Sequence, residues 1–124
     1  MAGAVAPAAL VSACAARPRT YEASVDVSTV APGTTFVPSA KGIDDYPILI
    51  VRSATGDYTA FSLQCTHMGC PVNAPVGTVL TCPCHGSQFD LAGKVVKGPA
   101  DAPLGKYHTE YHAGVKRLTV YVEA

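Results

Sequence analysis

Two short loops with mirrored cysteine and histidine positions limit what this chain can fold into more than any other feature of its sequence. The first is C-T-H-M-G-C at residues 65–70, and the second is C-P-C-H-G-S at residues 82–87. Thiolates and imidazoles on paired loops are typical of a metal centre. The two loops are therefore expected to meet at one end of a scaffold that holds them side by side.

The spacing within the loops picks out four candidate metal ligands. They are Cys65, His67, Cys82 and His85. Gly69 and Gly86 let the backbone turn close to a bound group and leave amides free to point at it. Pro71 and Pro83 stiffen the same loops, because the proline ring fixes the backbone φ angle.

The rest of the sequence predicts a turn-rich β domain. Glycine and proline are frequent, with 11 and 10 residues, and long stretches of helical periodicity are absent. The most apolar run, Y-P-I-L-I-V-R-S at 46–53, is bounded by turns and predicts a buried strand. The expected strands lie at 21–27, 34–37, 46–53, 57–64, 78–81, 87–91, 94–97, 106–112 and 115–122. We expect about eight to ten short antiparallel strands in a sandwich or small barrel.

The first twenty residues differ from the rest of the chain. Residues 1–16 are uncharged and nearly all small, and V-S-A-C resembles the lipobox before a lipidated cysteine, here Cys14. The segment is shorter than the about 20 apolar residues that a membrane span requires. We therefore expect residues 1–20 to be a signal remnant or lipobox-like segment with a tether, and 21–124 to be one folded domain. An Ala-rich disordered tail is the alternative for the first segment.

Charge gives no support for a nucleic-acid partner. Nine basic and nine acidic residues cancel, so the electrostatic footprint of a DNA- or RNA-binding protein is absent from the sequence. His108 and His112, in Y-H-T-E-Y-H, are expected to be surface or edge-strand residues, because the four loop positions already complete a ligand set.

Two cysteines and two histidines also form the ligand set of a structural zinc site, so a zinc-binding module is an alternative function. Zinc motifs, however, usually pair Cys with Cys and His with His, whereas the candidate ligands in each loop here are one Cys and one His. Zinc also leaves the further loop cysteines, Cys70 and Cys84, without a role.

The two motifs together resemble the cluster loops of Rieske iron–sulfur proteins, over about residues 60–105 by motif and 21–122 by strand order. The resemblance implies an all-β fold, a Rieske-type antiparallel β-sandwich or small barrel with a two-loop cluster-binding subdomain. It also implies one [2Fe-2S] cluster. By this resemblance Cys65 and Cys82 hold the inner iron, and His67 and His85 hold the outer one.

The resemblance further implies that Cys70 and Cys84 form a disulfide between the loops, as in the high-potential members, and a stable disulfide indicates an oxidising compartment. Ser87 occupies the place of a serine that donates to a bridging sulfide. Phe89 stands where high-potential relatives have a tyrosine, so we expect a potential below theirs but above that of the dioxygenase ferredoxins. A proline-rich loop covers the cluster in that group, and its expected residues are Gly98, Pro99 and Pro103.

The function implied is one-electron transfer on the outer side of the cytoplasmic membrane, in a periplasmic or extracytoplasmic position, with a lipid on Cys14 as the possible anchor. The expected partners are cytochrome b and quinol on the donor side, and a c-type cytochrome or copper protein on the acceptor side, in a quinol-oxidising cytochrome bc-type chain. An alternative is a small electron-transfer subunit or carrier for a periplasmic molybdenum oxidase of the arsenite oxidase type. The resemblance implies an electron-transfer protein by itself, and a quinol:cytochrome c oxidoreductase as the enzyme of which it would be a subunit.

Overall fold

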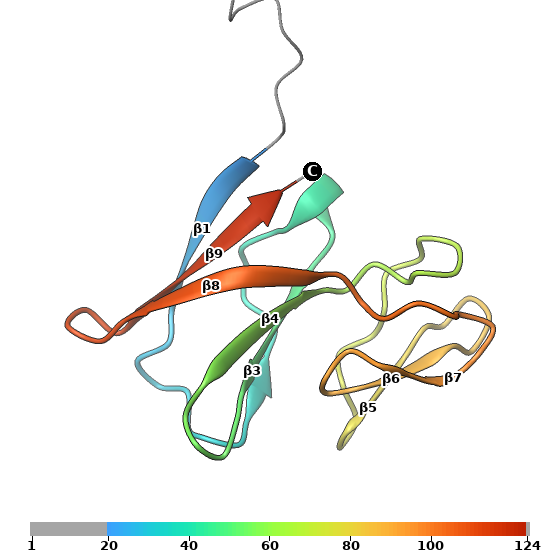
Figure 1. Cartoon of the computed structure of the whole chain (residues 1–124), viewed down its shortest axis with the longest axis horizontal. Helices are drawn as coiled ribbons and strands as arrows, with labels where there is room; N and C mark the ends of the chain where they lie inside the picture. The colour runs from blue at the N-terminus through green and yellow to red at the C-terminus, as the bar shows by residue number, and fades with distance from the viewer. Residues whose placement is uncertain (1–19, 124) are drawn as a thin grey trace, which may run out of the picture.

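The structure, a computed structural model, describes residues 20–123. Residues 1–19, with Cys14 and most of the expected tether, lie outside the described residues. Between 20 and 123 the chain forms nine strands in two antiparallel sheets (Figure 1). The strands are β1 (Thr20–Asp26), β2 (Thr35–Phe36), β3 (Ile48–Arg52), β4 (Tyr58–Ser62), β5 (Val79–Thr81), β6 (Gln88–Asp90), β7 (Val95–Lys97), β8 (Lys106–His112) and β9 (Arg117–Glu123).

The larger sheet is a curled six-stranded sheet with the order β1-β9-β8-β4-β3-β2, and the smaller sheet has the order β5-β6-β7. Figure 1 shows the smaller sheet beside one end of the larger one. The predicted all-β antiparallel class is therefore confirmed, and each expected strand is present with bounds shifted by a few residues.

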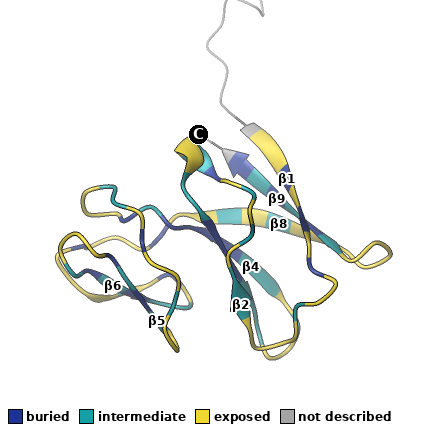
Figure 2. Cartoon of the chain, turned by 180° about the vertical axis from the view of Figure 1, so that it is seen from behind, coloured by how far each residue is buried: buried dark blue, intermediate teal, exposed yellow. Residues whose placement is uncertain are grey.

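Two adjacent strands, β3 and β4, face both hydrophobic cores, which explains why residues 48–51 of β3 form a continuous apolar run. In β3, Ile48 and Ile50 pack inside the curl of the large sheet, while Leu49 packs toward the small sheet. In β4, Ala60 packs inside the curl of the large sheet and Phe61 packs toward the small sheet. Successive strand side chains point to opposite faces, so a run without alternation indicates burial on both sides. Buried residues concentrate along these strands in Figure 2.

A short 3-10 helix at Ile43–Asp45 precedes β3 and was not predicted from the sequence. Asp44 and Asp45 have positive φ angles of 51° and 65°, a conformation that residues other than glycine seldom adopt. Aspartate is enriched there among non-glycine residues, but no local pattern marked these two. Across residues 20–123, no helix combines the length and apolarity that crossing a bilayer requires.

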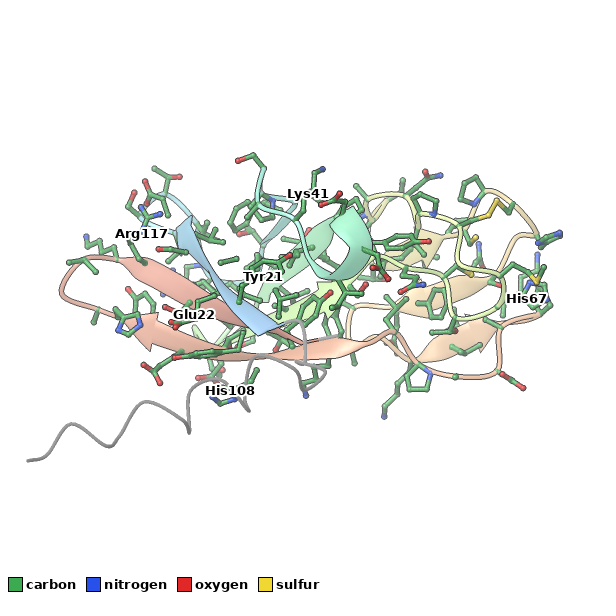
Figure 3. The ribbon with its side chains drawn as sticks, turned by 90° about the horizontal axis from the view of Figure 1, so that it is seen from above. Tyr21, Glu22, Lys41, His67, His108 and Arg117 are labelled. Atoms are coloured by element: carbon green, nitrogen blue, oxygen red, sulfur yellow. A yellow bond between two sulfur atoms is a disulfide. The ribbon has the colours of Figure 1, made fainter. Side chains whose placement is uncertain are left out.

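The two histidines of Y-H-T-E-Y-H lie on β8, between β9 and β4, and both are exposed. They are surface residues, as expected, although β8 is not an edge strand. His112 Nε2 lies 3.0 Å from Thr119 Oγ1, and the His108 ring lies 5.3 Å from that of Tyr121. Figure 3 shows His108 well away from His67.

Candidate metal centre

The first loop is a closed turn that begins just after the β3–β4 hairpin. The Cys65 N–H donates to the Cys70 carbonyl at 2.8 Å, and the Gly69 N–H donates back to the Cys65 carbonyl at 2.9 Å. Gly69 has a φ angle of +79°, where a side chain would be strained. The turn therefore needs the glycine that the sequence supplies.

The second loop, which follows β5 directly, repeats that backbone pattern. The Cys82 N–H donates to the Ser87 carbonyl at 2.8 Å, and the Gly86 N–H donates to the Cys82 carbonyl at 3.0 Å. Gly86 has a φ angle of +80°, almost equal to that of Gly69. The mirrored sequence motifs are thus two copies of one backbone turn.

The loops place two cysteines inside and two histidines outside. Cys65 and Cys82 are free thiols, only 3% and 1% exposed, and their thiol groups lie within hydrogen-bond reach of each other. His67 and His85 are exposed, and their rings meet edge to face with centroids 5.1 Å apart. Figure 3 shows His67 at the extreme end of the molecule, opposite the end that carries Arg117.

A disulfide joins the two loops. Cys70 and Cys84 are bonded, with an S–S distance of 2.01 Å. The sulfur atoms of Cys70, Cys82 and Cys84 all lie within 4.8 Å of one another. Cys70 and Cys84 are bonded to each other, so within this group of three only Cys82 has a free thiol that could bind a metal.

The loop backbone favours the thiolate form of Cys65. Burial raises the pKa of its thiol, but hydrogen bonds from the His67 and Met68 amides, the Cys82 thiol and the Ser87 hydroxyl outweigh burial and lower that pKa from its usual value. A thiolate is the form in which cysteine binds a metal ion. The first loop is thus arranged to hold negative charge on sulfur.

The two predicted tuning positions are both completely buried. Ser87 is 0% exposed, and its Oγ accepts a hydrogen bond from the Ala100 N–H at 3.0 Å. Phe89 is also 0% exposed and belongs to the core cluster that contains Cys65 and Cys82. The structure therefore brings both side chains to the base of the loops.

The expected proline-rich loop lies beside the first cysteine loop. Pro103 lines the same groove of about 690 Å³ as Cys65 and His67. Gly98 and Pro99 are exposed and joined by a cis peptide bond. The structure brings Pro103 to the candidate ligands, while the other two residues form the exposed start of the segment.

Two residues that connect the loops to the rest of the domain were missed from the sequence. Thr66 Oγ1 donates to the Ala102 carbonyl at 2.6 Å and joins the first loop to the proline-rich loop. The Tyr46 hydroxyl donates to the Gly69 carbonyl, 23 residues along the chain. No local sequence pattern predicts either contact. Tyr46, for example, looks like the first residue of an apolar strand.

Comparison with known proteins gives a family match across most of the domain. The family model described as the Rieske [2Fe-2S] domain matches residues 22–108, a range that contains both loops and the proline-rich loop. The cytochrome b6-f complex iron-sulfur subunit of Synechococcus elongatus is 45% identical over 76 residues, which are 60% of this chain and 41% of that protein. The chain thus spans less than half the length of that relative.

Two solved structures have a similar fold. The cyanobacterial plasma membrane Rieske protein PetC3 from Synechocystis PCC 6803 is 34% identical with a TM-score of 0.56, over 64% of this chain and 80% of that one. A chain of a hyperthermophilic respiratory Complex III is 26% identical with a TM-score of 0.60, over 77% of this chain and 71% of that one.

Proposed function

This chain belongs to the Rieske [2Fe-2S] domain family, and on that premise we propose that it transfers single electrons as a subunit or partner of a quinol-oxidising cytochrome bc-type chain. Family membership implies one [2Fe-2S] cluster as the cofactor. When bound, such a cluster accepts and releases one electron at a time.

The donor set fits that cluster. Buried Cys65 and Cys82 would hold the inner iron, and exposed His67 and His85 would hold the outer one. Two thiolates with two imidazoles distinguish a Rieske centre from a four-cysteine cluster, and the neutral imidazoles raise its potential. The observation that carries the proposal is that the two cysteines are buried while the two histidines are exposed, because this places the histidine side of the site at the protein surface.

The chain's own residues exclude water from the inner side and leave the outer side open. Phe89, Leu80 and Leu104 pack around the buried cysteines with at most 3% exposure each. Met68, beside His67, is 67% exposed. A redox partner would therefore approach over the His67 end, where the distance for electron transfer is shortest.

The relatives and the disulfide support a position on the outer side of the cytoplasmic membrane. The similar proteins are a cytochrome b6-f subunit and a plasma membrane Rieske protein, and the Cys70–Cys84 bond suits an oxidising compartment. The partners on this proposal are cytochrome b with quinol as donor, and a c-type cytochrome or copper protein as acceptor. A lipid on Cys14 is the proposed anchor, and mass spectrometry of the mature N-terminus with a Cys14→Ser control tests it.

The ligand assignment is tested by EPR spectroscopy of the dithionite-reduced protein. We expect a signal coupled to two histidine nitrogens, and His67→Ala or His85→Ala should abolish it. His108→Ala and His112→Ala are matched controls and should leave it unchanged, because both residues lie on the surface of β8. An EPR-silent protein that contains zinc would refute the cluster.

The choice of complex is tested by purifying the tagged chain from solubilised membranes of its source. We expect a b-type cytochrome to copurify, identified by its haem absorbance. Copurification of a molybdenum subunit instead would overturn the cytochrome bc-type assignment and leave electron transfer itself in place.

A further inference from the structure

The 3-10 segment at residues 41–46 is fastened to the large sheet by two tyrosine hydroxyls. Tyr21 Oη, from β1, lies 2.8 Å from each of the Lys41 and Gly42 carbonyl oxygens. Figure 3 shows Tyr21 and Lys41 near each other at the helical turn. The segment is therefore held by β1, although β1 is the strand at one edge of the large sheet.

Tyr107, from β8, holds the same segment from a second direction. Its hydroxyl accepts a hydrogen bond from the Ile43 N–H at 3.0 Å. A Cβ atom on Gly42 would collide with the Tyr107 hydroxyl, so any larger residue at this position would displace that hydroxyl. The segment also closes on itself, because the Gly42 N–H donates to the Tyr46 carbonyl at 2.9 Å.

Tyr46, at the end of this segment, reaches the first cysteine loop. Its hydroxyl donates to the carbonyl of Gly69. The N–H of Gly69 in turn donates to the carbonyl of Cys65 at 2.9 Å, and a Cβ atom on Gly69 would lie 3.4 Å from the Tyr46 hydroxyl. Tyr46 thus contacts the one residue whose positive φ angle closes the loop.

We propose that Tyr46 is a positioning residue for the first ligand loop, and that it keeps the His67 and Met68 amides directed at the Cys65 sulfur. Both amides lie inside the turn that the Gly69 N–H closes on the Cys65 carbonyl, so they are among the nearest donors along the chain for hydrogen bonds to that sulfur. Such bonds stabilise the reduced form of an iron–sulfur centre and raise its potential. The inference rests on the proposed function, since it concerns the same site.

The effect of Tyr46 is confined to one of the two loops. The second loop has a contact of its own, in which the Ser87 hydroxyl accepts the Ala100 N–H at 3.0 Å. Loss of the Tyr46 hydroxyl should therefore loosen residues 65–70 and leave residues 82–87 unchanged. A general loss of stability would not produce that difference.

The test compares Tyr46→Phe with Tyr111→Phe. Tyr111 is 43% exposed, and its ring lies 5.1 Å from that of Tyr58, far from the loops in sequence. The Tyr111→Phe variant therefore removes a tyrosine hydroxyl without changing the 3-10 segment. Two quantities are measured: the midpoint potential by protein-film voltammetry, and amide hydrogen exchange by mass spectrometry. Replacing Tyr46 by 4-aminophenylalanine, which keeps a donor at the ring end, serves as the rescue.

For Tyr46→Phe we expect a lower midpoint and about fivefold faster exchange at residues 65–70, the ratio for one lost hydrogen bond. The rescue variant should restore both, and Tyr111→Phe should resemble the wild type. Unchanged values in Tyr46→Phe, or equal changes in Tyr111→Phe, would overturn the proposal.

Hydrogen exchange separates this proposal from the function on which it rests. If the wild type holds no cluster, the function fails, while exchange at 65–70 still reports on Tyr46. If only Tyr46→Phe loses the cluster, faster exchange limited to 65–70 supports the positioning role. Faster exchange throughout the domain in that variant would contradict it.

Discussion

The hydroxyl of Ser87, with none of its surface exposed, accepts the N–H of Ala100 at 3.0 Å and so joins the second ligand loop to the proline-rich loop. The same hydroxyl is among the hydrogen-bonding groups that lower the pKa of the Cys65 thiol in the first loop. One side chain therefore connects three segments that are far apart in the sequence, which gives its removal two separate consequences.

Ser87→Ala should lower both stability and potential. The Ala100 N–H would be left buried without a partner, at a cost of about 1–3 kcal/mol in the free energy of unfolding. The midpoint should also fall, because a hydrogen bond to ligand sulfur is lost. Urea denaturation and film voltammetry measure the two effects. Ser39→Ala, at an exposed serine, is the control, and an equal response from both variants would contradict the prediction.

Phe89→Tyr should raise the midpoint potential. Phe89 lies in the core cluster with Cys65 and Cys82, so we expect a hydroxyl added to its ring to donate to a ligand sulfur. Phe36→Tyr adds the same hydroxyl beside the other core and should leave the potential unchanged. A midpoint in Phe89→Tyr equal to or below that of the wild type in film voltammetry would refute the prediction.

Removal of the disulfide should destabilise the protein. Cys70 and Cys84 are 14 residues apart, and a cross-link that closes a loop of this size contributes about 3 kcal/mol. The double variant Cys70→Ser/Cys84→Ser should therefore unfold at a lower urea concentration, with the EPR signal lost at the same midpoint. Unfolding at the wild-type urea concentration would show that the turns alone hold the loops together.

Gly93→Ala should be more costly than Gly33→Ala, although the two glycines have nearly equal φ angles of +79° and +78°. A Cβ atom on Gly93 would lie 2.7 Å from Phe61 Cε1, whereas nothing lies within 4 Å at Gly33. Backbone strain should cost both variants about 1 kcal/mol, and overpacking should add about 1–3 kcal/mol at Gly93. Thermal and urea unfolding measure the difference in stability between the two variants. Equal losses of stability would contradict the prediction, because they would mean that the Phe61 ring moves aside at no cost.

Local sequence patterns were sufficient to predict the strands and the two turns. Alternating or continuously apolar runs mark strands because side chains alternate between faces. The glycines at positions 69 and 86 mark the turns because only glycine adopts the required φ angle without strain. The 3-10 segment was not predictable in this way, since Asp44 and Asp45 have positive φ angles without any glycine to indicate them.

The sequence by itself therefore determined the all-β class and the two loops with their mirrored positions. Only the tertiary structure decided that the cysteines are buried while the histidines are exposed. It alone also brought Ala100 to Ser87 and Tyr46 to Gly69. The physical reason is that strand and turn preferences act over a few residues, whereas these contacts depend on how two sheets pack and on which backbone groups remain unpaired between them.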